Sequence, residues 1–284
     1  MRKTIKQPAV VSGIGLHTGV PATMTFKPAE NGITFLRTDL PNAQPILAHV
    51  SNVGSTLRGT NLKNATAEVW TIEHAMSALH ALGITDIAVE MDGPEPPVTD
   101  GASDVYVDAL LKAGIQELTS EQPVLNIKQK ITYSCGNIFY SAEPADKLTF
   151  TFVYRHKHPL LAHSEYTFEF TQENYIEQIA RARTFGFEEE LAFLKAHGLA
   201  KGGNLENAVI IGKDNYINER RFPDEPVRHK LLDLIGDISL TGRKLPPLAI
   251  KCECGGHKHN VIFGKILLAN SEDKWAQKIA CGNY

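Results

Sequence analysis

The sequence predicts an α+β fold with two similar halves, each consisting of a sheet with helices packed against it. Two observations support this prediction. Strand-like and helix-like segments follow one another in a similar order before and after the polar stretch 119–123, and 284 residues suffice for two domains. We therefore predict a first domain at 1–118, a linker at 119–123 and a second domain at 124–284. No residue-level repeat accompanies this similarity, so the duplication rests on the order of elements alone.

Apolar patterning places the elements of the first half. Alternation and turn residues predict strands at 20–26, 33–37 and 86–91, and helical spacing predicts helices at 72–82 and 103–113. Thr71 is the expected N-cap of the first helix. Gly83 and Gly114 follow the two helices and are expected to stop them.

The second half is predicted in the same way. Strands are expected at 124–133, 148–154, 166–170 and 248–254. A helix is expected at 172–183 behind Thr171 as its cap, another near Pro226, which suits the first helical position, and a last one after Asn260.

An insertion at about 185–210 separates two of these helices. Phe187, Leu191 and Leu194 recur there at i, i+4 and i+7, which is typical of an amphipathic helix. Two interpretations are open: a packed surface helix or one wall of an apolar ligand channel. The periodicity alone favours the packed helix, because apolar helical stripes usually face a core.

Composition excludes several classes of protein. The 29 basic and 32 acidic residues give a net charge of −3, which leaves no electrostatic footprint for nucleic acid. The longest apolar runs have the length of strands, so we expect neither a transmembrane segment nor a signal peptide, and a cytoplasmic protein. For Cys135, Cys252, Cys254 and Cys281, ordinary reduced thiols are favoured over a metal site, since Cys252-x-Cys254 has no second pair.

The most informative pattern is a histidine and an aspartate four residues apart, His229 and Asp233. On a helix these positions lie on one face, about 40° apart. A neutral imidazole and a carboxylate are two of the three ligands of a His₂-carboxylate zinc site. Asp237 continues the stripe by one further turn. The pair taken alone is also compatible with a hydrogen bond on a helix surface.

Three further histidines have informative neighbours. Glu73 and His74 are adjacent, so on a helix their side chains diverge by about 100°, which suits a base and a metal ligand serving one site. By themselves they are better explained as an exposed pair at a helix N-terminus. His257 follows Gly255-Gly256 and is a candidate general acid, and His17 is framed by glycines in the same manner. No phosphate-binding loop, dinucleotide fingerprint or His-Glu-x-x-His motif is present in the sequence.

Seven stretches, taken in order, resemble one family, the zinc-dependent UDP-3-O-acyl-N-acetylglucosamine deacetylases of lipid A biosynthesis. They are Gly13-Ile-Gly-Leu-His-Thr-Gly19, Thr71-Ile-Glu-His74, Asp100-Gly-Ala-Ser103, Ala182-Arg-Thr-Phe185, Gly198-Leu-Ala-Lys-Gly-Gly203, Glu225-Pro-Val-Arg-His-Lys-Leu-Leu-Asp-Leu-Ile-Gly-Asp237 and Gly256-His257. Each stretch is weak alone, but their common order covers nearly the whole chain. The sequence departs from the family pattern at Pro96-Pro97-Val98-Thr99 and at Lys258-His259, beside the expected site, which leaves acyl-chain preference open.

The resemblance implies a duplicated, layered α+β sandwich with an insertion in each domain and the active site between the domains. It implies hydrolysis of the N-acetyl group of the UDP-acyl-amino-sugar to release acetate, the committed step of lipid A biosynthesis, with Zn²⁺ as cofactor, although Fe²⁺ would also suit a His₂Asp site. The implied roles are His74, His229 and Asp233 as metal ligands, Glu73 as general base, His257 as general acid oriented by Asp237, Thr184 as a donor to the tetrahedral intermediate, Lys230 and His17 at the substrate, and Phe185 and Phe187 in an insertion that lines the acyl passage.

Two other functions remain open at this point. One is a different zinc amidohydrolase that acts on another N-acylated amine. The other is a non-catalytic protein whose sandwich domains bind nucleic acid or a partner, and the net charge of −3 counts against it. The sequence does not determine the oligomeric state, for which a monomer is favoured.

Overall fold

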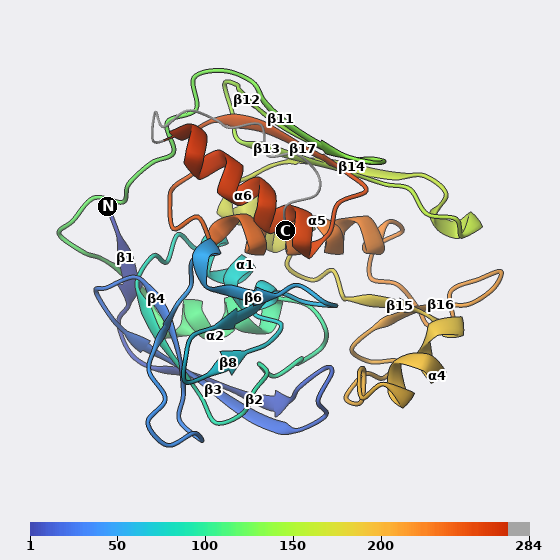
Figure 1. The fold of residues 1–284 in the computed structure, drawn as a ribbon, viewed down its shortest axis with the longest axis horizontal. Coiled ribbons are helices and arrows are strands. Elements are labelled where there is room, and N and C mark those ends of the chain that lie inside the picture. Colours follow the sequence, from blue (N-terminus) through green and yellow to red (C-terminus); the bar gives the residue numbers. More distant parts are fainter. Residues whose placement is uncertain (272–284) are drawn as a thin grey trace.

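The computed structural model describes residues 1–271, and Figure 1 shows its layers. Two five-stranded sheets form the outer layers, and the main helices lie between them. A continuous apolar core runs through the molecule and includes Phe26 and Phe35 under the first sheet and Phe150 and Phe152 under the second. The predicted α+β class and layered arrangement are confirmed.

The first sheet has the order β2-β3-β9-β4-β5. Its strands are β2 (Ala9–Ile14), β3 (Pro21–Pro28), β9 (Ile87–Met91), β4 (Ile33–Arg37) and β5 (Ile46–Leu47). The β4–β9 pair is parallel and the other neighbours are antiparallel. Along β3 and β9 every second residue is buried, as expected for a sheet that faces a core on one side.

The second sheet repeats this topology. Its order is β11-β12-β17-β13-β14. Its strands are β11 (Ile131–Cys135), β12 (Ile138–Pro144), β17 (Leu248–Glu253), β13 (Thr149–Tyr154) and β14 (Ser164–Glu169). Again the latest strand in the sequence occupies the centre and pairs in parallel with the third strand. The predicted halves 1–118 and 124–284 each supply one sheet, and the domain division itself stays a prediction.

The helix layer contains α1 (Glu73–Ala81), α2 (Asp104–Ala113), α5 (Glu225–Ser239) and α6 (His257–Ser271). Helix α5 packs against α1, α6 and the second sheet, so it lies at the centre of the molecule. All of its residues except Arg228 and Lys230 are buried. Its polar residues are therefore held in fixed positions by the surrounding core, which is the reason that they can form a site.

Shorter elements complete the structure. They are β1 (Lys3–Ile5) paired with β10 (Ile115–Glu117), the one-turn helices η1 (Val50–Asn52) and η2 (Pro159–Leu161), the sheet of β6 (Val53–Ser55), β7 (Asn61–Lys63) and β8 (Glu68–Val69), α3 (Gln172–Gln178), and β15 (Phe185–Phe187), α4 (Glu188–Ala196) and β16 (Val209–Ile211). The β6–β8 sheet and the β15–α4–β16 unit precede α1 and α5, so each half carries one insertion before its central helix. Within residues 1–271, no helix combines the length and apolar character needed to cross a membrane.

Three predicted helix boundaries are wrong. Helix α1 is capped by Ile72 rather than Thr71, whose φ of 51° is left-handed and whose hydroxyl instead donates to Glu95 at 3.1 Å. Helix α3 ends at Gln178 rather than Arg183. In the turn that follows, the carbonyl oxygen of Ala182 and the side chain of Arg183 are directed toward α5. Helix α6 begins at His257 itself rather than after Asn260.

The strand predictions also need correction. The expected strand at 124–133 begins only at Ile131, and residue 124 forms an isolated bridge with Lys244. Strands β2 and β12 were not predicted. Cys254 lies beyond the end of β17 with a φ of 54°, so it does not share a strand face with the buried Cys252, and Cys281 lies outside the described residues. The stops at Gly83 and Gly114 are confirmed, with φ of 67° and 71°.

Candidate metal centre and active site

The site forms where α5 crosses the first turn of α1. Gly236 allows the two helices to approach this closely, since a Cβ at that position would lie 2.1 Å from the backbone oxygen of Glu73. Glycine in a helix interior costs about 1 kcal/mol relative to alanine. Here it allows backbone contact between two helices that come from different halves of the chain. The residues His229, Asp233 and Asp237 of α5 thereby face Glu73 and His74 of α1.

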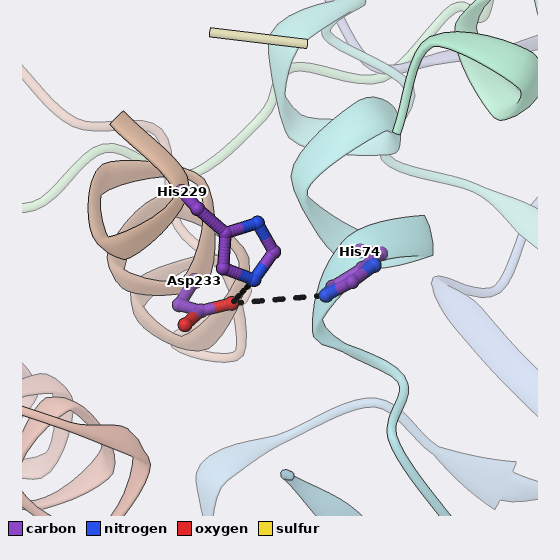
Figure 2. A group of neighbouring side chains, drawn as sticks. All are labelled: His74, His229 and Asp233. Carbon is purple, nitrogen blue, oxygen red and sulfur yellow. Dashed lines mark ion pairs between the residues drawn. The ribbon is translucent and has the colours of Figure 1, made fainter. Parts of the chain in front are cut away.

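Figure 2 shows His74 and His229 pointing at the carboxylate of Asp233 from the two helices. The Nε2 atom of His229 lies 3.3 Å from Oδ1 of Asp233, and that of His74 lies 3.8 Å from the same oxygen. One donor atom from each residue lies within 4.8 Å of the others, and all three residues are buried. The three ligands predicted from the sequence are therefore brought together.

The donor set fits a tetrahedrally coordinated divalent cation. Two ligand atoms at about 2.1 Å from a tetrahedral zinc are separated by about 3.4 Å. The distances of 3.3 and 3.8 Å lie close to that value. In addition, Oδ1 of Asp233 is a buried oxygen without a hydrogen-bond partner in the described residues. A buried, unpaired carboxylate oxygen is costly unless a cation or donor occupies the space beside it.

The protonation states of the three side chains also suit a cation. Burial lowers the pKa of His74 to about 3 and lowers the pKa of His229, so both imidazoles are neutral. Nδ1 of His229 donates to the carbonyl oxygen of Ala182 at 3.0 Å, which leaves the Nε2 lone pair directed at the site. Burial opposes ionisation of Asp233, but the neighbouring His229, Lys230 and His257 side chains lower its pKa and keep it a carboxylate.

Glu73 occupies the first position of α1, beside the three donor residues. Its side chain is buried, and Oε2 accepts a hydrogen bond from the backbone N–H of Thr60 at 2.9 Å. Burial raises the pKa of Glu73 to about 8, with Asp237 and Asp233 acting in the same direction. A carboxylate with a raised pKa is a stronger base than an exposed one, as general-base catalysis requires.

His257 faces Glu73 from the N-terminus of α6. Its Nδ1 donates to Oδ2 of Asp237 at 3.1 Å, and its Nε2 lies 3.9 Å from Asp233. Burial lowers the pKa of His257, but Asp237, Glu73 and Asp233 outweigh it and raise the value to about 9. Donor atoms of Glu73, Asp233 and His257 lie within 4.8 Å of one another, so the two candidate proton-transfer groups flank the same ligand.

Four of the other predicted residues, Thr184, Lys230, His17 and Phe185, line the cavity beside this centre. Thr184 is held by backbone hydrogen bonds from its N–H to Gly101 and from Val209 to its carbonyl, each 2.8 Å long. Nζ of Lys230 donates to Oδ2 of Asp233 at 2.8 Å and lies 5.4 Å from the centroid of the Phe185 ring.

His17 enters the cavity from the glycine-rich turn after β2. Its Nε2 contacts the carbonyl oxygen of Arg58 at 3.1 Å, and its Nδ1 accepts from the N–H of Ala200 at 3.4 Å. The turn is held by the buried carboxylate of Glu95, which accepts hydrogen bonds from the N–H groups of His17 and Thr18. This part of the first half therefore contacts the insertion of the second.

The cavity has a volume of about 490 Å³, and its lining divides into a polar and an apolar part. The polar part contains Glu73, His74, His229, Asp233, His257, Lys230, Thr184, His17 and Arg58. The apolar part contains Phe185, Leu191, Leu194, Leu205, Ala208 and Ile210. Helix α4 thus forms a cavity wall, the interpretation that periodicity alone did not favour.

Phe187 does not line this cavity. It caps α4 and packs against Leu161 and Ile211 in a small separate cluster, stacked on His156 with a centroid distance of 4.5 Å. It lines a second cavity of about 620 Å³, together with residues of the segments 157–159 and 211–214. Phe187 was predicted to bind substrate, but it does not lie in the cavity that contains the candidate metal centre.

Sequence reasoning missed three buried residues that hold the site, Thr60, Glu95 and Asn260. Nδ2 of Asn260 donates to Oδ2 of Asp237 at 2.8 Å. Asn260 lies three residues after His257 on one helix, so an earlier helix start would have placed both on one face. Thr60 and Glu95 come from loops, for which the sequence carries no periodic signal. His259, to which no role was assigned, is bound to Tyr133 at 2.8 Å.

The fold and this centre define a candidate metal-dependent hydrolase, with three ligand side chains beside a carboxylate and a histidine suited to proton transfer. Comparison with known proteins identifies the family. The family model described as UDP-3-O-acyl N-acetylglycosamine deacetylase matches residues 2–269. The chain belongs to this family.

Curated relatives agree with this membership. A protein of Citrifermentans bemidjiense named UDP-3-O-acyl-N-acetylglucosamine deacetylase is 43% identical over 91% of this chain and 86% of its own length. Proteins with the same name from Nautilia profundicola and Helicobacter hepaticus are each 38% identical over 94% and 95% of this chain, and over 92% and 91% of their own lengths. The resemblance predicted from seven short stretches is confirmed.

Proposed function

We propose that this chain hydrolyses the N-acetyl group of UDP-3-O-acyl-N-acetylglucosamine and releases acetate, as a step of lipid A biosynthesis. The observation that carries the proposal is that donor atoms of Glu73, His257 and Asp233 lie within 4.8 Å of one another, with two neutral histidines directed at the same carboxylate of Asp233. Membership of a deacetylase family supports the choice of reaction and substrate.

His74, His229 and Asp233 would hold the cation, for which we propose Zn²⁺; a His₂Asp set also accommodates Fe²⁺. When bound, such a cation acts as a Lewis acid toward a carbonyl oxygen and lowers the pKa of water. The neutral state of both imidazoles and the ionised state of Asp233 are the states that ligation requires.

Glu73 acts in this proposal as the general base, since it is a buried carboxylate with a raised pKa at the edge of the donor set. His257 acts as the general acid and gives its Nε2 proton to the leaving amine. Asp237 fixes the ring of His257 and stabilises its charged form. Thr184, on the cavity wall, is the proposed donor to the oxyanion of the tetrahedral intermediate.

The cavity supports the substrate class. Its apolar part, formed by Leu191, Leu194 and their neighbours, suits a fatty acyl chain. Lys230 and Arg58 at its polar part supply cationic groups for a diphosphate. A cytoplasmic location, a monomeric state and the domain division at 119–123 remain predictions from the sequence and the resemblance.

The test is to measure metal content and acetate release for the wild type and His229→Ala together. We expect about one equivalent of zinc and acetate release from UDP-3-O-acyl-N-acetylglucosamine in the wild type, and loss of both in the variant, which lacks one of three ligands. Arg228→Ala is the matched control, because Arg228 precedes His229 on α5 and pairs with Asp224 rather than with the donor set.

Two outcomes would contradict the proposal. Acetate release from simple N-acetylated amines at a rate equal to that from the UDP-sugar would indicate a different amidohydrolase. A wild-type protein that holds no metal and has no metal-dependent hydrolytic activity would exclude the catalytic function.

A further inference from the structure

Thr60 is hydrogen-bonded to the proposed base, Glu73, and to Asp237, the residue that orients the proposed acid. It is fully buried in the loop between β6 and β7, and the sequence patterns assign it no role. Its backbone N–H donates to Oε2 of Glu73 at 2.9 Å. Its hydroxyl donates to Oδ1 of Asp237 at 2.5 Å. These two carboxylates come from helices of different halves, and one residue contacts both.

The backbone of Thr60 is fixed independently of these two bonds. Its carbonyl oxygen accepts from the N–H of Ile72, the residue that caps α1, at 3.0 Å. The preceding Gly59 is also crowded, because a Cβ there would lie 3.0 Å from the hydroxyl oxygen of Thr71 and 3.3 Å from Oε1 of Glu73. The loop therefore follows the first turn of α1 closely, and a displacement of Thr60 would move Glu73 with it.

The hydroxyl of Thr60 completes the set of donors around Asp237. Oδ1 accepts from Thr60, whereas Oδ2 accepts from Asn260 and from Nδ1 of His257. Asp237 is fully buried, so each of its oxygens needs a partner. With Oδ1 occupied, the carboxylate is held in one orientation and presents Oδ2 to His257. Without the hydroxyl, Oδ1 is a buried oxygen that lacks a donor, and the carboxylate is held through Oδ2 alone.

We propose that Thr60 is a positioning residue that sets the relative placement of Glu73 and His257. It acts on Glu73 directly through its N–H and on His257 through Asp237. The inference rests on the proposed function, since it assumes that these two residues transfer protons. It predicts that loss of the hydroxyl lowers kcat and leaves substrate binding unchanged, because Thr60 does not line the substrate cavity.

The experiment compares Thr60→Val, which keeps the shape and the backbone N–H, with Thr60→Ser, which restores a hydroxyl. We expect Thr60→Val to lower kcat by about 10- to 100-fold, the usual effect of losing a residue that orients a catalytic group, with KM changed by less than about 2-fold. Thr60→Ser should recover most of that loss. Metal content should stay at the wild-type level in both variants, because Thr60 contacts none of the three ligands.

Thr4→Val is the matched control. Thr4 is a buried threonine of the same half whose hydroxyl accepts from the N–H of Ala29 at 3.1 Å, away from the site. It should lose stability to a similar degree and keep its kcat. Thr60→Ala, which adds no methyl group, replaces Thr60→Val if the latter does not fold. In an Asp237→Asn background, Thr60→Val should have a much smaller effect on kcat, since the partner of the hydroxyl is already changed.

These measurements distinguish a wrong role for Thr60 from a wrong proposed function. If the wild type deacetylates the substrate and Thr60→Val has the kcat of Thr4→Val, Thr60 has no positioning role although the proposed function stands. The same conclusion follows if Thr60→Val changes KM or metal content instead of kcat. If the wild type has no deacetylase activity, the proposed function is wrong and the role of Thr60 in it is wrong as well.

Discussion

The metal centre and the apolar wall of the same cavity are built in different ways. The centre lies on α1 and α5, in the helix layer between two sheets, and its donor residues are buried. The wall comes from β15, α4 and β16, where most residues of α4 are exposed and the local core consists of Leu161, Phe187 and Ile211. A region with few buried apolar contacts opens at lower free energy than a central core. The candidate metal centre is therefore placed by the main core, and we expect the apolar wall, which has a small core of its own, to be a separate unit.

The largest effect is expected at the centre. Glu73→Gln removes the proposed base and keeps the size of the side chain, so we expect kcat to fall by about 10²–10⁴-fold. Metal content should not change, because Glu73 is not among the three ligands. Glu190→Gln is the matched change on the wall, where Glu190 lines the cavity and pairs with Arg58 at 3.2 Å, and it should alter kcat only slightly. Equal losses in the two variants would remove the distinction between centre and wall.

The pH dependence of kcat/KM provides the second test. His257 must hold its proton to act as the acid, and its pKa is raised to about 9 by Asp237, Glu73 and Asp233 against the effect of burial. Activity should therefore fall as the pH rises through about 9. Glu73 must lose its proton, and burial raises its pKa to about 8, so activity should rise as the pH increases toward that value. A bound divalent cation moves this rising limb to lower pH.

His257→Gln separates the two limbs. The variant lacks the acid, so it should be about 10²–10⁴-fold slower and its profile should not fall at alkaline pH. The rising limb, which belongs to Glu73, should remain. An alkaline limb that persists unchanged in this variant would assign the acid to a different residue.

The stripe on α5 was predictable from the sequence because a helix imposes a fixed spacing, whereas Glu73 and His74 were assigned to the site only through the family resemblance. His229, Asp233 and Asp237 lie on one stripe of α5, and Glu73 and His74 mark the start of α1. Periodicity could not reveal that the two helices touch. That contact depends on Gly236, whose missing side chain leaves room for the backbone of Glu73. In the sequence alone, a glycine inside a helix does not indicate that another helix packs against it.

The loops were less predictable for a physical reason. Thr60 and Glu95 each act through several hydrogen bonds made to segments distant in the sequence, and such contacts leave no local pattern. Asn260 did have a local signal, the i, i+3 spacing from His257, which was lost because the helix was predicted to begin too late. In the expected strand 124–133, Val124 is 50% exposed and forms only an isolated bridge with Lys244, whereas Leu125 is buried in the core without belonging to a sheet.

The smallest effect is expected at the wall, and there it should depend on the substrate. Leu191→Ala shortens a side chain that lines the cavity, so kcat/KM for a long-chain acyl substrate should fall by about 10-fold, as expected for lost apolar contact in a binding pocket. The same variant should handle a short-chain analogue like the wild type, because the proton-transfer groups are unchanged. Phe193→Ala is the matched control on α4, since Phe193 is 61% exposed and lies outside the cavity lining. A loss that is equal for both acyl lengths would mean that α4 supports the centre, and the wall would then not be an independent unit.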